Sequence, residues 1–152
     1  MNDTPLTLKQ AIDIAQAAVD AGATAGFAPL CVVVLDAGGN VLALHRDERA
    51  SIYRPHIALA KASGCLGMGF GGRELAKRAQ AMPQFFSALG NIFPNGIAPV
   101  AGGVLLKDRN GRICGAVGVS GDTSDNDEIC ALAGIASAGL VADTGELPGQ
   151  DR

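Results

Sequence analysis

Residues 115–128 read GAVGVSGDTSDNDE, and this stretch joins an apolar segment with spaced glycines to a run of hydroxyl and acidic residues. A phosphate-binding P-loop would need a Gly-Lys-Ser/Thr ending, and no lysine follows these glycines. A calcium loop would need a central glycine and a different spacing of Asp122, Asp125 and Asp127. The stretch therefore predicts a strand that leads into a helix, with Ser124 or Asp125 capping the first turn.

Two pairs of apolar runs predict β-hairpins. The runs 100–106 and 113–120 flank Asn110-Gly111, the strongest short signal for a hairpin turn. The β-branched run 29–36 is typical of a strand covered on both faces, and the turn residues DAGGN lead from it into a second strand over 41–46. Hairpins make the sheet antiparallel. A dinucleotide-binding fold needs a crossover to a parallel strand, so the hairpins argue against that fold.

Helical periodicity accounts for most of the remaining chain. Thr7-Leu-Lys-Gln10 has the form of a capping box, and apolar residues recur at helical spacing from there to about residue 22. Further helices are expected over 55–66, over 73–80, and from Ser124 or Asp125 to 140. Pro83 is expected to restart a turn that buries three residues, Phe85, Phe86 and Leu89. The tail from Asp143 onward is expected to fray, and the element order predicts an α+β domain with an antiparallel sheet.

Composition limits the class of protein. A chain of 152 residues with 48% hydrophobic content is expected to form one domain, residues 1–152, with a substantial core. Its net charge of -3 does not provide the basic surface that nucleic acids require, so no nucleic-acid partner is expected. No apolar run reaches the length of a membrane span and the N-terminus does not resemble a signal peptide, so we expect a cytoplasmic protein without a membrane partner. The four scattered cysteines are expected to be buried thiols.

The segment 45–61 concentrates the polar chemistry of the chain. It holds both histidines, the only tyrosine, three arginines and a lysine. Three of its cations, Arg46, Arg54 and Lys61, can bind a carboxylate or phosphate. Tyr53 or His56 can ligate iron or transfer a proton, while His45 is interpreted as structural. The alternative is a polar surface loop whose arginines pair with Asp47 and Glu48.

Four motifs in order resemble the GlcG/HbpS family. They are VVVLDAGGNVL at 32–42, IALAKA at 57–62, PVAGGV at 99–104, and GAVGVSG at 115–121 followed by Asp127-Glu128. That family includes haem-binding proteins and the C-terminal domain of PduO-type cobalamin adenosyltransferases. The resemblance covers about residues 6–141 and leaves 142–152 as a tail. It implies a profilin-like, three-layer fold with a five-stranded antiparallel sheet flanked by helices, a fifth strand within 91–101, and a homo-oligomer.

The resemblance also suggests site residues. The positions that match its motifs are expected to be pocket or scaffold residues; they are Lys61, Gly102, Gly103, Asp127 and the run 115–121. Haem is the cofactor it implies, with His56 or Tyr53 as a ligand of the haem iron and no metal site formed by the protein alone. The sequence departs from the commoner family pattern at Tyr53-Arg-Pro-His56, which suggests a specialised pocket there.

Three functions remain open from the sequence. In the first, the protein binds haem or another carboxylate-bearing small molecule between the second helix and the sheet, where Arg46, Arg54 and Lys61 meet carboxylates. In the second, it is a lyase or isomerase of a small carboxylated intermediate, with His56 or Tyr53 as general acid or base. In the third, it is a non-catalytic accessory or assembly protein that binds no small ligand.

Overall fold

A computed structural model describes residues 5–146 of the chain. Its elements, in chain order, are α1 (Leu8–Ala25), β1 (Cys31–Asp36), β2 (Val41–Arg46), α2 (Arg54–Met68), α3 (Gly72–Ala81), α4 (Pro83–Ile92), β3 (Gly103–Lys107), β4 (Ile113–Ser120), α5 (Ser124–Ser137) and β5 (Val141–Asp143). No helix in this part of the chain is both long and apolar enough to cross a membrane.

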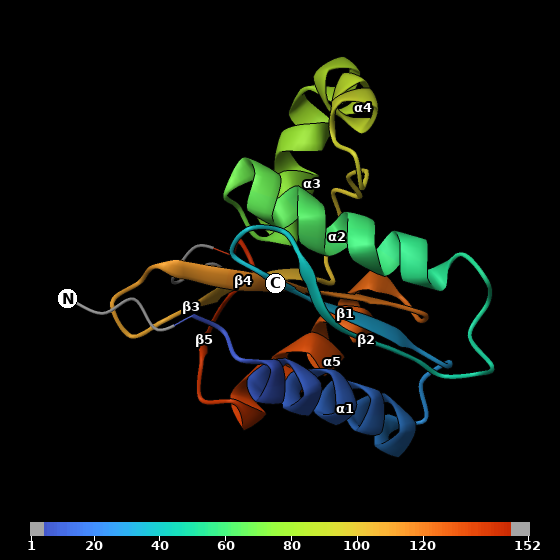
Figure 1. Ribbon diagram of the computed structural model, residues 1–152. Helices are drawn as coiled ribbons and strands as arrows, with labels where there is room; N and C mark the ends of the chain where they lie inside the picture. The colour runs from blue at the N-terminus through green and yellow to red at the C-terminus, as the bar shows by residue number, and fades with distance from the viewer. Residues whose placement is uncertain (1–4, 147–152) are drawn as a thin grey trace.

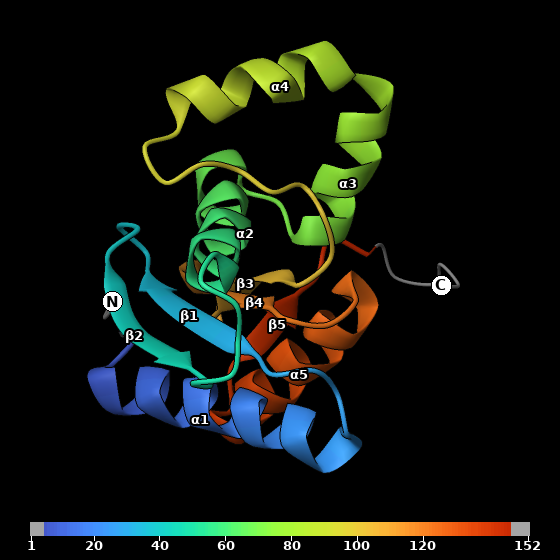
Figure 2. The ribbon, with the colours of Figure 1, turned by 90° about the vertical axis from the view of Figure 1, so that its right-hand side faces the viewer.

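The five strands form one antiparallel sheet in the order β2-β1-β4-β3-β5. Helices α1 and α5 pack together on one face, whereas α2 lies on the other face with α3 and α4 stacked outward from it (Figures 1 and 2). The predicted α+β domain, with a five-stranded antiparallel sheet flanked by helices, is confirmed.

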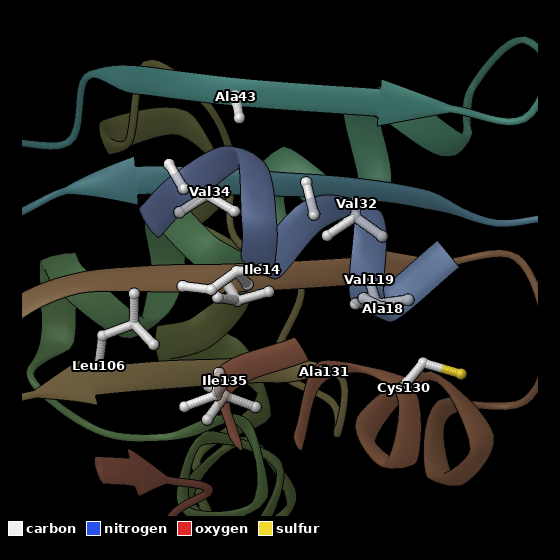
Figure 3. Packing of buried hydrophobic residues seen from close by; sticks show 14 of the residues in the cluster. Ile14, Ala18, Val32, Val34, Ala43, Leu106, Val119, Cys130, Ala131 and Ile135 are labelled. Atoms are coloured by element: carbon white, nitrogen blue, oxygen red, sulfur yellow. The ribbon is translucent and has the colours of Figure 1, made fainter. Parts of the chain in front are cut away.

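The sheet separates two apolar cores because neighbouring residues on a strand point to opposite faces. On the α1 and α5 side, Val32 and Val34 of β1 pack with Ile14 and Ile135 (Figure 3). On the α2 side, Val33 and Leu35 belong to a second core with Leu105 and Leu75. Strand β1 is thus covered on both faces, as its continuous apolar run predicted.

Small residues let α2 lie directly on the sheet. A Cβ atom at Gly118 of β4 would collide with the backbone carbonyl of Ala58. One at Gly103 of β3 would lie 2.7 Å from the carbonyl oxygen of Lys61 and 2.8 Å from the sulfur of Cys65. The small side chains of α2 therefore serve contacts inside the domain, and all four cysteines are buried and free.

The fifth strand lies elsewhere than predicted. Residues 91–101 form no strand; α4 continues to Ile92, and a loop carrying Pro94 and Pro99 follows. Proline cannot donate to a strand ladder, and Gly102 has a φ of 105°, so the extended chain begins only at Gly103. The fifth strand is β5, which pairs with β3. The first residues of the predicted tail are held in place, because Lys107 pairs with Asp143 and the Arg73 N–H donates to the Thr144 carbonyl. The rest of that tail, 147–152, lies outside the described residues.

Two local predictions are wrong. Phe86 and Leu89 are buried as expected, but Phe85 is 48% exposed. The N-cap of α5 is Thr123, whose hydroxyl accepts from the Asn126 N–H at 3.2 Å, rather than Ser124 or Asp125. The acids at 127 and 128 do not cap the helix, since both are turned into the protein.

Candidate functional site

A buried ion pair joins α2 to α5. The ammonium nitrogen of Lys61 lies 3.0 Å from Asp127 Oδ2 and donates to the Val119 carbonyl at 2.9 Å. Only 3% of Lys61 and 1% of Asp127 are exposed. The second carboxylate oxygen of Asp127 accepts from the backbone N–H of Asp122 at 2.9 Å. Burial raises the pKa of the Asp127 carboxyl, and the charges of Lys61 and Arg54 act against that shift.

Gly102 completes this cluster. A Cβ at Gly102 would stand 2.9 Å from the ammonium nitrogen of Lys61 and 3.2 Å from the Cβ of Asp127. Glycine is required there both for this approach and for the positive φ. The structure therefore brings together four of the residues that the resemblance singled out, as a closely packed buried cluster of Lys61, Gly102, Gly103 and Asp127.

A second ion pair lies beside the first. Arg73, in the first turn of α3, donates two hydrogen bonds to the Glu128 carboxylate, at 2.8 and 3.1 Å, and one to Asp125 at 2.8 Å. Glu128 is fully buried. The first turn of α5 is thus held to α2 through Asp127 and to α3 through Glu128. The sequence predicted only a helix cap in this acidic run, because spacing alone does not show which partners lie across the fold.

Arg54 borders the buried cluster, and its guanidinium has more N–H donors than the described residues accept from. It stands two turns before Lys61 on the same side of α2, and its guanidinium donates to Ser120 Oγ at 3.1 Å. A guanidinium has five N–H donors, and Ser120 is the one acceptor that the described residues give it. Ser120 is itself buried and was not singled out from the sequence, since an isolated serine at a strand end carries no motif.

Tyr53 and His56 lie at the exposed start of α2. Their rings meet edge to face with centroids 5.5 Å apart, and 65% of Tyr53 is in contact with solvent. The neighbouring Ile52 and Ile57 are also exposed aliphatic residues. Tyr53, Arg54 and His56 therefore all lie at the first turn of α2, where Arg54 is turned toward Ser120 at the end of β4.

Arg46 lies away from this turn of α2. Its guanidinium donates to the backbone carbonyls of Asp47, Glu48 and Ala50 and so fixes the loop after β2. It borders an open hollow of about 430 Å³ on the α1 side of β2, together with Gln16, Val19, Leu44 and His45. In the same loop Arg49 pairs with Asp47 and Glu48, as the surface-loop interpretation expected, and lowers the pKa of Asp47 to about 2.

Comparison with known proteins gives a consistent set of relatives. A protein of Citrobacter freundii, described as an uncharacterized 15.0 kDa protein in the dhaT-dhaS intergenic region, is 32% identical over 126 residues, which are 83% of this chain and 87% of that protein. The crystal structure of a double mutant of Streptomyces reticuli HbpS is 33% identical, with a TM-score of 0.76, and covers 90% of this chain and 88% of that one. The PduOC:heme complex shares the fold, with a TM-score of 0.81 at 23% identity, and covers 91% of this chain and 98% of that one.

The family described as "Haem degrading protein HbpS-like" matches residues 6–136, nearly the whole of the described part of the chain. The relatives and the match agree with the resemblance carried by the four sequence motifs. The chain belongs to the HbpS-like family.

Proposed function

We propose that this protein binds haem, or another cofactor that carries carboxylates, at the first turn of α2. The observation that carries the proposal is Arg54, a guanidinium with spare donors in the same helical turn as His56 and next to Tyr53 in the chain. The family description and the haem complex of PduOC, which has the same fold, support haem over other ligands. A role in haem or cofactor handling follows from such binding.

The side chains present at α2 suit haem in their chemistry. An imidazole or phenolate can ligate the iron, a guanidinium can hold a propionate in a bidentate pair, and aliphatic side chains can cover part of a porphyrin face. The iron ligand would be His56 or Tyr53, and Arg54 would hold the propionate. Ile52 and Ile57 would cover part of the porphyrin face. When bound, haem would supply an iron centre for redox chemistry. The ammonium group of Lys61 is buried and already donates to two acceptors inside the protein. We therefore propose that Lys61 supports the scaffold and does not contact the ligand.

Titration of the purified protein with hemin tests the proposal. We expect a saturable shift of the Soret band that is weakened or altered in His56→Ala or Tyr53→Phe. Arg49→Ala is the matched control, because Arg49 lies in the preceding loop and is held by Asp47. No saturable shift in the wild-type protein would overturn the proposal. A shift unchanged in the double variant of His56 and Tyr53 would remove both residues as ligands.

The contribution of Arg54 can be separated from that of the iron ligand. Arg54→Ala should weaken the binding of hemin but leave the binding of hemin dimethyl ester unchanged, because the ester has no carboxylates. Equal losses for the two porphyrins would show that Arg54 does not bind a propionate.

We further propose that the protein is a homo-oligomer, as the family resemblance implied. Light scattering of the purified protein measures the mass directly, and the mass of a single chain would contradict it.

A further inference from the structure

Ser120 ends strand β4 beneath the first turn of α2. Neighbouring residues of a strand face opposite sides of the sheet, and Val119 belongs to the core on the α1 and α5 side, so Gly118 and Ser120 face α2. Gly118 lies against the backbone of Ala58. Arg54 comes four residues earlier in the helix, about 6 Å along its axis, and Ser120 two residues later in the strand, about 6.6 Å along it. The two spacings match, so the packing of α2 on β4 places Arg54 opposite Ser120.

The hydroxyl of Ser120 restricts where the Arg54 guanidinium points. Ser120 is completely buried, whereas Arg54 is half-buried and donates from Nη1 to Ser120 Oγ at 3.1 Å. The backbone of Ser120 is paired with Cys31 of β1, so the acceptor has a fixed position. An arginine side chain has several rotatable bonds, and holding it in one conformation costs rotamer entropy. Its other N–H donors are thus oriented before a ligand arrives, which lowers the entropic cost of binding.

The acceptor that holds Arg54 carries no charge, although two carboxylates lie near. Hydrogen bonds, first that from the Ala28 N–H, lower the pKa of Asp122, and the charge of Arg54 adds to this shift. Burial raises the pKa of Asp127, and the charges of Lys61 and Arg54 act against it. Both carboxylates accept from other donors, and within residues 5–146 neither forms an ion pair with Arg54. A carboxylate partner would neutralise the guanidinium, whereas a hydroxyl fixes it and leaves its charge for a ligand.

We infer that Ser120 is a positioning residue for the carboxylate of the ligand. Its hydroxyl holds the Arg54 guanidinium in the orientation that receives a propionate and does not neutralise it. The inference rests on the proposed function and adds to it a residue that does not touch the ligand. Because Ser120 is completely buried, its effect on binding passes through Arg54.

Hydroxyl variants of Ser120 test the inference in hemin titrations. Ser120→Ala should weaken the binding of hemin about two- to tenfold, the range expected for one hydrogen bond, and should leave the binding of hemin dimethyl ester unchanged. Ser120→Thr keeps the hydroxyl and should bind hemin like the wild type. Ser137→Ala is the matched control, because it removes a hydroxyl that donates to Gly134 at the other end of α5. Equal losses for hemin and its ester, or none for hemin, would overturn the inference.

A double-mutant cycle tests whether Ser120 acts through Arg54. In the Arg54→Ala background the hydroxyl has lost its partner, so adding Ser120→Ala should not change the affinity for hemin further. A loss from Ser120→Ala that is as large without Arg54 as with it would show that Ser120 affects the ligand through the fold, and would contradict the positioning role.

A measurement without ligand separates the inference from the proposed function. Nitrogen-15 relaxation of the arginine Nε–H groups reports the mobility of each guanidinium, and the Arg54→Ala variant assigns the Arg54 signal. Ser120→Ala should make Arg54 more mobile and leave Arg73, which is held by Glu128, unchanged. Unchanged mobility of Arg54 would overturn the positioning role alone. A wild type that shows this response and yet gives no saturable binding of hemin would overturn the proposed function, and with it the propionate as the ligand of Arg54.

Discussion

Lys61 and Asp127 are 66 positions apart in the chain and meet at 3.0 Å in an ion pair that is almost completely shielded from water. The pair joins helices from opposite sides of the sheet, because α2 covers one face and α5 the other. Glu128 extends the same connection to α3 through Arg73. The first turn of α5 is therefore the point at which the three layers are fixed to one another.

Breaking the buried pair should strongly destabilise the protein. Lys61→Met leaves the Asp127 carboxylate buried without its counter-ion, and losses of about 3–5 kcal/mol are typical of such changes. Urea unfolding followed by circular dichroism measures the loss. The double variant Lys61→Met with Asp127→Leu should lose less than the single one, because no charge is left buried. Lys9→Met is a control at an exposed pair and should change little.

Gly102 should tolerate alanine much less well than Gly111. Both have positive φ, at 105° and 79°, so each substitution carries the strain of a left-handed conformation, about 1–2 kcal/mol. At Gly111 a Cβ meets nothing within 4 Å, whereas at Gly102 it would crowd the ammonium nitrogen of Lys61 at 2.9 Å. The unfolding free energy of Gly102→Ala should therefore fall further than that of Gly111→Ala. Equal losses would mean that the ion pair shifts aside without cost.

The two acids that pair with Arg73 should differ in their contribution to stability. Glu128→Gln weakens a two-pronged hydrogen bond to a fully buried carboxylate, and hydrogen bonds to charged groups contribute about 1.5–3 kcal/mol. Asp125→Asn alters a pair in which the carboxylate is 75% exposed, and should cost less than about 1 kcal/mol. Chemical denaturation of both variants gives the comparison. A larger loss at Asp125 would contradict the assigned roles.

Local patterns predicted most of the fold. The capping box at Thr7 is present with both of its hydrogen bonds, and the turns at DAGGN and Asn110-Gly111 place four strands correctly. The fifth strand was not predictable in the same way. Val141–Asp143 has three residues and no alternation of its own, and it becomes a strand because β3 offers it an unpaired edge.

The candidate site was predictable only in part. The cluster at 53–56 was visible as a concentration of polar residues, and the family motifs indicated Lys61, Gly102, Gly103 and Asp127. That these four form a buried cluster depends on contacts between α2, β3 and α5, which no local spacing encodes. Arg46 does not lie with Arg54, because it donates to backbone carbonyls of its own loop. No sequence pattern indicates those contacts.

Asp122 should make the stability of the protein depend on acid pH. Its carboxylate accepts from the Ala28 N–H at 2.7 Å, from the Thr123 N–H at 2.8 Å and from the Asn126 side chain at 2.8 Å. These bonds lower the pKa of Asp122 in the folded protein below its ordinary value of 3.8. Between the folded and unfolded pKa values the unfolded chain binds more protons, so this contribution is complete above the unfolded pKa and is lost as pH falls through the folded one.

Comparison of the wild type with Asp122→Asn isolates that contribution, because the other carboxylates are common to both proteins. Urea unfolding at steps from pH 6 to pH 3 gives the difference in unfolding free energy between them. The wild type should be the more stable at pH 6, and its advantage should shrink as the pH falls below about 4. The backbone N–H of residue 122, which donates to Asp127, is retained in the variant, so the buried ion pair is not disturbed. An advantage that stays constant or grows toward pH 3 would show that the three donors do not favour the charged form of Asp122.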